Sequence, residues 1–131
     1  MIINVSNHPS AKWAPEQLEA ARRLSGCGAV IDIPHPSVPP EGDEQAVARL
    51  ASEALFAILS ARDRHRAETG CTACSVHLMG EAGFTDYLNK LLRLRDIRTV
   101  YSTTGREVVE QPDGTKLSRF RFVRFRDYLA V

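Results

Sequence analysis

The chain has 131 residues, 44% of them hydrophobic and 25% charged, which is the composition of one globular domain spanning residues 1–131. Seventeen Lys and Arg against sixteen Asp and Glu leave a formal net charge of +1, so neither DNA nor an acidic membrane surface is expected as a partner. No apolar run approaches the ~20 residues of a membrane-spanning helix, and three cysteines, an odd and low number, indicate the reducing cytoplasm.

The start of the chain has the pattern of a strand–helix–strand unit. We expect a strand over residues 2–5 and then a helix over 15–24, because Pro15 suits a first helical turn and apolar residues recur at spacings of three. A nearly all-apolar run over 28–33 predicts a strand that is covered on both faces.

One long helical pattern dominates the middle of the chain. Four prolines and a glycine over 34–42 predict a stiff, extended loop before it. A helix is expected over 43–66 with Asp43 as its N-cap, since apolar residues follow the i, i+3, i+4, i+7 spacing of one helix face. These residues are Val47, Leu50, Ala51, Ala54, Leu55, Ile58 and Leu59.

The second half continues the alternation and then changes. We expect a strand over 73–78, a helix over 82–95 and a strand over 98–103. The inward residues of that helix are Phe84, Leu88, Leu91 and Leu92.

The C-terminal segment has an antiparallel pattern. Val108-Val109 and the run 117–125 flank a turn at 111–115, which predicts a hairpin. The alternation of Phe and Arg in the last strand shifts phase before Phe125, so a bulge is expected near Val123-Arg124. This alternation is typical of a half-buried strand, and its aromatic face also suits a subunit contact.

Together these elements predict an α/β fold. We expect a Rossmann-like three-layer sandwich of four mainly parallel strands with crossover helices, extended by the C-terminal antiparallel hairpin. Each apolar run ends in a polar cluster, and the carboxyl ends of parallel strands share the edge where open α/β sheets bind ligands. The four clusters are Ser6-Asn7-His8, Pro34-His35-Pro36, Met79-Gly80-Glu81 and Ser102-Thr103-Thr104-Gly105-Arg106.

The first and last clusters have the chemistry of anion and ribose recognition. The hydroxyl, amide and imidazole of Ser6-Asn7-His8 suit a phosphate or a sugar hydroxyl, and His8 suits general acid–base catalysis. The run 102–106 offers hydroxyls, a glycine and a guanidinium, although it is not a P-loop. The alternative for both clusters is ordinary turn chemistry.

The two middle clusters add backbone amides and a further imidazole. Exposed amides near Gly80 at a helix start favour an anion, whereas Glu81 opposes one by its charge and suits either an orienting role or an acidic first turn. His35 lies at a strand end and is expected to reach the site, whereas His77, inside an apolar strand, is expected to be a satisfied buried histidine. No dinucleotide fingerprint is present, so neither NAD nor FAD is expected.

The cysteines do not predict a metal or redox site. Cys71 and Cys74 form a C-x-x-C pair, but no second pair supplies four zinc ligands, and a thioredoxin-like pair would follow a strand rather than precede one. We expect a loop whose Cys74 packs inward, with Cys27 in the core and His65 exposed at a helix end.

Several of these residues resemble a known family. Asn4-Val5-Ser6-Asn7-His8-Pro9, Met79-Gly80-Glu81 with Phe84-Thr85, Ser102-Thr103-Thr104-x-Arg106, and the tail Phe120-x-Phe122-Val123-x-Phe125-Arg126-x-Tyr128 are similar to small CRISPR-associated Rossmann-like (CARF-like) proteins. These are the cyclic-oligoadenylate sensors and ring nucleases of type III systems. Relatives carry an acidic residue where Gly105 stands here, so no role is expected for that position.

The resemblance implies a homodimer that binds a cyclic oligoadenylate, cyclic tetra-adenylate above all, across its two-fold axis. Cleavage in such ring nucleases is metal-independent and needs no cofactor, because a ribose 2′-hydroxyl attacks the adjacent phosphate and the signal is thereby switched off. The residues expected to act in catalysis are Asn7, His8 and Arg106. Those expected to contact the ligand are Ser6, His35, Gly80, Glu81, Thr85, Ser102, Thr103 and Thr104.

Two other functions stay open at this point. The chain is either an enzyme or a non-catalytic sensor that only sequesters the same ligand, and an unrelated enzyme acting on a nucleotide or phosphosugar is a third alternative. The sequence alone also leaves open the ring size, the base, the catalytic histidine, the strand order and the dimer surface.

Overall fold

The computed structural model describes residues 1–130 and has an α/β fold with one mixed sheet. The strand order is β2-β1-β3-β4-β5; the first four strands are parallel and β5 is antiparallel to β4. The strands are β1 (Ile2–Val5), β2 (Val30–Asp32), β3 (Ser75–Leu78), β4 (Arg98–Glu110) and β5 (Lys116–Asp127). The α/β class, the parallel strands and the antiparallel hairpin are therefore confirmed.

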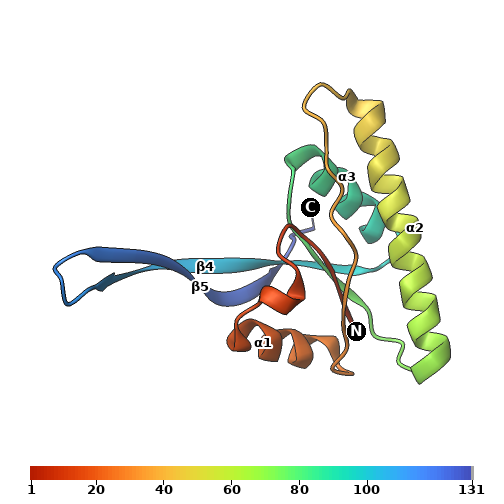
Figure 1. The fold of residues 1–131 in the computed structure, drawn as a ribbon. Coiled ribbons are helices and arrows are strands. Elements are labelled where there is room, and N and C mark those ends of the chain that lie inside the picture. The colour runs from red at the N-terminus through yellow and green to blue at the C-terminus, as the bar shows by residue number, and fades with distance from the viewer. Residues whose placement is uncertain (131) are drawn as a thin grey trace.

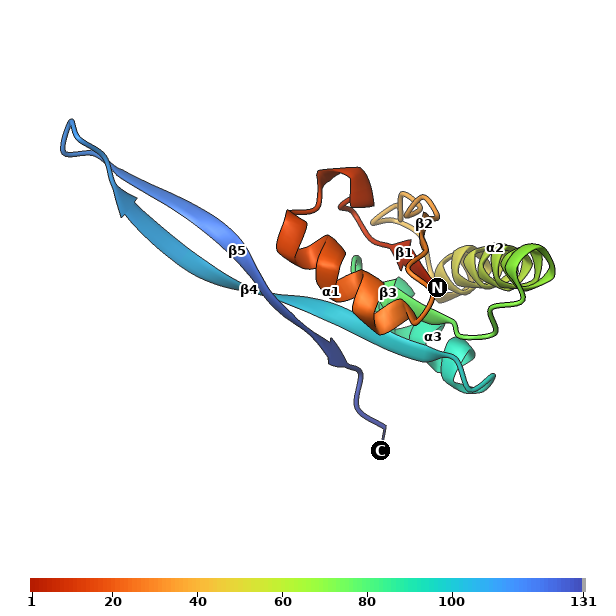
Figure 2. The ribbon, with the colours of Figure 1, turned by 90° about the horizontal axis from the view of Figure 1, so that it is seen from below.

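Helices cover both faces of the sheet (Figures 1 and 2). They are α1 (Pro15–Ser25), α2 (Glu44–Thr69) and α3 (Ala82–Arg93), with a short 3-10 helix at Ser10–Lys12. Alternate side chains of β1 point to opposite faces of the sheet. Ile2 packs with α1 on one face, and Ile3 and Val5 pack with α2 and α3 on the other. Within the described residues, none of the helices combines the length and apolar content needed to cross a bilayer.

The helices follow their apolar stripes, as predicted. The Asp43 carboxylate accepts a hydrogen bond of 2.9 Å from the Ala46 amide, which confirms the N-cap of α2. This helix ends at Thr69, three residues later than expected, because its C-cap is Gly70 in the left-handed conformation at φ 75°. The predicted inward residues Phe84, Leu88 and Leu92 of α3 are buried.

Two strands differ from the prediction. β2 covers only three residues, and Gly28, two residues before it, has a φ of 78°, which is incompatible with an extended strand. β4 continues to Glu110 instead of ending at residue 103, so the run 102–106 is strand and not a turn. The cause is long-range, because each residue from Thr104 to Glu110 is opposite a partner in β5.

β4 and β5 form a two-stranded ribbon that projects from the body of the molecule (Figures 1 and 2). Its register shifts once: Thr103 is opposite Arg124 and Thr104 is opposite Phe122, which leaves Val123 without a partner. The predicted bulge near Val123-Arg124 is confirmed. The bulge lets Phe125 turn toward Trp13 of the body, at a centroid distance of 6.2 Å.

Candidate functional site

Four neighbouring strands each place one polar side chain on the α1 face of the sheet, level with the carboxyl ends of β1, β2 and β3. These residues, here called the polar row, are Asp32 of β2, Asn4 of β1, His77 of β3 and Ser102 of β4. The Asn4 amide donates to Asp32 Oδ1 at 2.8 Å, and Asn4 Oδ1 accepts from His77 Nδ1 at 2.8 Å. Asn4 and His77 are each 1% exposed, so the middle of the row is buried, whereas Asp32 at its end is exposed.

The hydrogen bonds of the polar row fix the tautomer of His77. Asn4 Nδ2 donates both to Asp32 and to the His8 carbonyl, so Asn4 Oδ1 is the acceptor facing His77. His77 therefore carries its proton on Nδ1, and its Nε2 accepts from the Ser102 hydroxyl at 3.1 Å. Burial, with a smaller contribution from His8, lowers the pKa of His77 to about 4, so the ring is neutral at pH 7.

A neutral imidazole that accepts from a serine is also the arrangement that activates a nucleophile. Here two observations oppose that role. The rings of Trp13 and Phe125 lie against His77 at centroid distances of 5.2 and 5.5 Å. The Ser102 hydroxyl also lies 3.0 Å from Met79 Sδ, a second acceptor. The expectation that His77 is a satisfied buried histidine is confirmed.

The polar row holds the loop that follows β1. The His8 carbonyl accepts from Asn4 Nδ2 at 2.8 Å and from Trp13 Nε1 at 3.0 Å. The Ser10 amide and hydroxyl donate to the Asp32 carboxylate at 3.0 and 2.6 Å. Burial raises the pKa of Asp32, but the hydrogen bonds from Ser10 and Asn4 outweigh it and keep this pKa below its usual value.

This anchoring decides which side chains of the first cluster are available. Ser6 is buried and its hydroxyl donates to Asn4 Oδ1 at 2.8 Å, so Ser6 is already satisfied within the protein. Asn7 and His8 are exposed. The loop therefore presents an amide and an imidazole to solvent from a fixed backbone.

Two hollows lie near the carboxyl edge of the sheet, one between the ends of β1 and β2 and the other between β4 and the start of α3. The first, of about 430 Å³, is lined by Asn4, Ser6, Asn7, Pro9, Asp32, Ile33, Pro34 and His35. The second, of about 370 Å³, is lined by Met79, Gly80, Ala82, Thr85, Asp86, Asn89, Tyr101 and Tyr128. The expected ligand residues Ser6, Asn7 and His35 thus meet in one hollow, and Gly80 and Thr85 meet in the other.

His35 and Gly80 lie against each other between the two hollows. The His35 ring occupies the space that a Cβ on Gly80 would need. His35 Nδ1 is 2.8 Å from the Pro36 carbonyl and donates to it, so the ring presents Nε2 as an acceptor. His35 Nε2 and Thr85 Oγ1 are the buried side-chain polar atoms of residues 1–130 that have no hydrogen-bond partner. Such atoms are rare, and His35 Nε2 is left without a partner because it faces Gly80.

The position of these two atoms in the topology is also informative. The chain passes from β1 to β2 on one side and from β3 to β4 on the other, so the strand order reverses between β1 and β3. Open α/β sheets bind ligands in the crevice at such a reversal.

Replacing Gly80 by Ala tests the contact with His35. We expect Gly80→Ala to lower the free energy of unfolding by about 1–3 kcal/mol, because the new methyl group displaces the His35 ring. The measurement is urea unfolding at pH 7. The control is Gly105→Ala, whose Cβ would meet Val123 at an ordinary 3.5 Å and should cause no loss. Equal stability of the two variants would contradict the contact.

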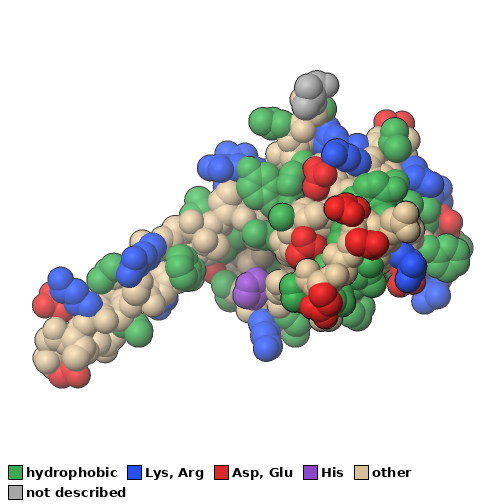
Figure 3. Space-filling view, turned by 90° about the horizontal axis from the view of Figure 1, so that it is seen from above, with side chains coloured by type: hydrophobic (Ala, Val, Ile, Leu, Met, Phe, Trp, Pro, Cys, Tyr) green, Lys and Arg blue, Asp and Glu red, His purple; other side chains and the backbone are tan. Residues whose placement is uncertain are grey.

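The start of α3 is not free to bind an anion. The Glu81 carboxylate accepts from the Gly83 and Phe84 amides at 2.6 and 3.2 Å, so the amides expected to hold a phosphate are already capped. Glu81 therefore acts at the helix start, as the N-cap of α3 and not within its first turn. Figure 3, which looks onto the carboxyl edge, shows acidic side chains gathered over the middle of the body, with basic ones around its margin and both kinds on the ribbon.

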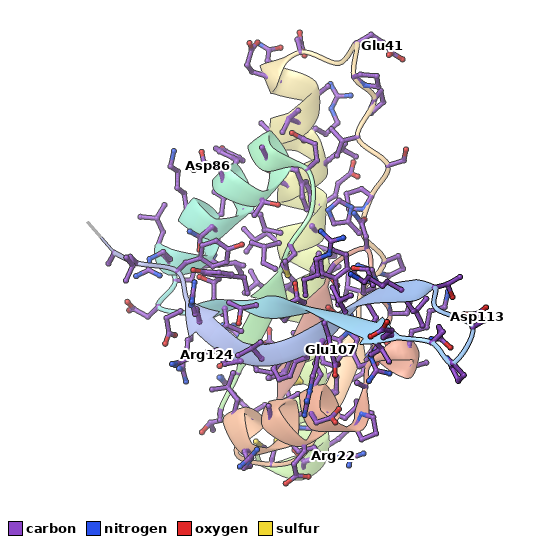
Figure 4. The ribbon with its side chains drawn as sticks, turned by 90° about the vertical axis from the view of Figure 1, so that its left-hand side faces the viewer. Arg22, Glu41, Asp86, Glu107, Asp113 and Arg124 are labelled. Carbon is purple, nitrogen blue, oxygen red and sulfur yellow. The ribbon has the colours of Figure 1, made fainter. Side chains whose placement is uncertain are left out.

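The last cluster is not assembled as a loop. Thr103 Oγ1 donates to the Arg124 carbonyl at 3.1 Å, and Arg106 Nε donates to Ser118 Oγ at 2.6 Å across the ribbon. Thr104 is exposed within the same strand. In Figure 4, Glu107 and Arg124 lie along the ribbon and Asp113 marks its tip. Within one chain, Thr103, Thr104 and Arg106 therefore line neither hollow.

Sequence reasoning did not identify the polar row as a unit. The available signal was one polar residue near the end of each apolar strand: Asn4, Asp32 and His77. Each residue by itself is an unremarkable interruption, and only the parallel register places them side by side.

Comparison with known proteins gives one match. The family described as "Uncharacterized protein MJ1673 family" has a sequence model that matches residues 1–126. No curated protein and no solved structure matches the chain.

Proposed function

The chain belongs to the uncharacterized MJ1673 family, and we propose that it binds a cyclic oligoadenylate at the carboxyl edge of its sheet and opens the ring without a metal. The resemblance to CARF-like proteins motivates the choice of ligand. The strand order with helices on both faces supports a Rossmann-like arrangement, in which nucleotides occupy this edge.

The observation that carries the proposal is the hollow between the ends of β1 and β2, which is lined by Ser6, Asn7 and His35. These groups offer a hydroxyl, an amide and an imidazole, the chemistry that suits ribose hydroxyls and phosphate oxygens. Asn7 lines this hollow, and the exposed His8 follows Asn7 on the anchored loop. Fixed polar groups around an open hollow lower the entropy cost of binding.

The reaction needs no external nucleophile. The ribose 2′-oxygen forms a bond to the adjacent phosphorus while the bond from phosphorus to the 5′-oxygen of the next nucleotide breaks. The 2′-hydroxyl loses its proton and the departing 5′-oxygen gains one, which leaves a linear product with a 2′,3′-cyclic phosphate and a 5′-hydroxyl. His8 would transfer the proton, and the Asn7 amide would hold a phosphate oxygen in line.

His8→Ala should slow ring opening by more than about tenfold without unfolding the protein, because its side chain is exposed. The assay is single-turnover incubation of the full chain with cyclic tetra-adenylate in the presence of a chelator, followed by chromatography of the products. The control is Lys12→Ala, an exposed change just past the loop that lines neither hollow. Wild-type cleavage by His8→Ala would remove this site assignment.

The same assay separates the alternatives. An intact ring with a clear thermal shift would favour the non-catalytic sensor, and binding at a hundredfold excess over Kd adds about 2.7 kcal/mol of stability. Binding of mononucleotides alone would favour an unrelated nucleotide or phosphosugar enzyme.

The ribbon bears on the proposed homodimer. Its exposed apolar side chains, between 52 and 76% accessible, suit a subunit contact, and a symmetric ring suits a two-fold dimer. They are Val108, Leu117, Phe120 and Val123. Because Arg106 lies on the ribbon and outside both hollows, we propose that it acts on the ligand held by the partner.

A mixing experiment tests this arrangement as part of the same prediction. His8→Ala and Arg106→Ala should each be slow alone, and their mixture should regain activity. A mixed dimer pairs an intact His8 with an intact Arg106 at one of its two sites. Absence of recovery would show that Arg106 does not act across the dimer.

A further inference from the structure

A second cluster of reactive side chains lies at the opposite edge of the sheet, where the N-terminus is seen in Figure 1. Cys27 follows α1, His65 lies in the last turns of α2, and Cys71 follows the C-cap of α2. The two sulfur atoms and one imidazole nitrogen lie within 4.8 Å of one another. Two thiols and an imidazole form a ligand set that zinc prefers.

The spacing fits a tetrahedral cation. Bonds of about 2.3 Å to sulfur and 2.0–2.1 Å to nitrogen, at a tetrahedral angle, place the two ligand atoms about 3.5 Å apart. Cys27 Sγ and His65 Nε2 are 3.5 Å apart. This pair therefore stands at ligand spacing before any ion is bound, and Cys71 Sγ lies within 4.8 Å of both atoms. A site that is nearly formed lowers the cost of binding.

Hydrogen bonds hold two of the ligands in place. The Thr69 hydroxyl donates to the His65 carbonyl at 2.8 Å and accepts from the Cys71 amide at 3.1 Å, so one side chain links both ligand backbones. Gly70, at φ 75°, turns the chain between them. Outer groups that fix ligand orientation in this way are a regular feature of metal sites.

The turn after α1 orients the third ligand. Gly26 and Gly28 have φ values of 74° and 78°, and the Gly28 amide donates to Ser25 Oγ at 2.7 Å. The Met1 nitrogen donates to Cys27 Sγ at 3.1 Å and to the Ala73 carbonyl at 2.6 Å, so the start of the chain also holds this side chain in place.

We propose that Cys27, His65 and Cys71 bind one zinc ion through two thiolates and one imidazole, with the fourth position open to water or another ligand. The ion would tie the turn after α1 to the turn after α2. Only Cys71 of the Cys71-x-x-Cys74 pair belongs to this site, because Cys74 packs against the core as expected. Cys27 was expected in the core, but it is exposed.

Cobalt substitution tests the proposal on the full chain. Protein freed of metal with a chelator under reducing conditions is titrated with Co²⁺. We expect one equivalent to give a thiolate-to-cobalt charge-transfer band and the visible bands of tetrahedral cobalt, and one equivalent of Zn²⁺ to abolish both.

The variants assign the ligands. Cys27→Ser and Cys71→Ser should each weaken Co²⁺ binding by more than about 100-fold, beyond the cost of a lost outer-shell partner. His65→Ala should shift the visible bands, and it provides a ligand variant that keeps both thiols if a cysteine variant misfolds. Cys74→Ala is the control and should bind as the wild type does. Binding that survives both serine variants, or that is lost in Cys74→Ala, would overturn the proposal, as would absence of a charge-transfer band.

Discussion

Asn4→Ala should lower the free energy of unfolding by about 3–5 kcal/mol, the largest loss that we expect from a single polar side chain. The substitution removes the acceptor of His77 Nδ1 and the donor to the His8 carbonyl, and it leaves the Ser6 hydroxyl without its shortest contact. A buried polar group that loses its only partner costs about 1–3 kcal/mol, as His77 Nδ1 does here. The His8 carbonyl and the Ser6 hydroxyl keep other partners, so each of the two further bonds lost adds about 0.5–1.5 kcal/mol.

Urea unfolding at pH 7 measures this loss, with the midpoint compared at constant slope. Asn7→Ala is the matched control, because it removes the same amide from an exposed position three residues along the chain. Its effect should stay within about 0.5 kcal/mol. If the two alanine variants unfold at the same urea concentration, the hydrogen bonds of Asn4 do not stabilise the fold as argued.

The Asn4 bonds connect stability to the candidate site. Asn4 holds the His8 carbonyl, and the loop that exposes Asn7 and His8 folds over it. A buried network that is fully satisfied rigidifies what it holds. We therefore place Asn4 in a positioning role: it fixes the loop without facing solvent itself.

Local patterns predicted the elements that local interactions stabilise. The apolar stripe of α2 predicted its helix, and Asp43 predicted its start, because both signals lie within one or two turns. The bulge at Val123 was predictable for the same reason, since a change of phase between neighbouring side chains requires it. The length of β4 could not be predicted from local patterns, because residues 104–110 are extended through their pairing with β5.

Some residues of the candidate site were also predictable from the sequence and others were not. Ser6, Asn7 and His35 converge because parallel strands end at one edge, a geometric rule that follows from the strand pattern. Arg106 does not converge, because β4 carries it past that edge. Cys27 and His65 are 38 residues apart, so no spacing rule on neighbouring cysteines connects them.

The protein should lose about 3 kcal/mol of stability as the pH falls from 6.5 to 4. His77 has a pKa of about 4 in the native state and 6.5 in the unfolded chain. Between these pH values the unfolded chain binds a proton that the native protein does not bind, so protonation favours unfolding. Stability is therefore complete above pH 6.5 and falls as the pH approaches 4. The lowered pKa of Asp32 acts in the same direction, but only below its usual value of 3.8.

The groups packed around His77 make it the source of this loss. Asn4, Ser102, Trp13 and Phe125 are uncharged, so no neighbouring carboxylate contacts the ring to stabilise the imidazolium. Urea unfolding across this range should show a steep decline for the wild type and for His8→Ala, whose ring is exposed, and a flatter one for His77→Gln. The ring protons of His77 in the native protein, followed by NMR, should not titrate above about pH 5. A His77 that titrates near 6.5, or a decline unchanged in His77→Gln, would show that its burial does not cause the acid sensitivity.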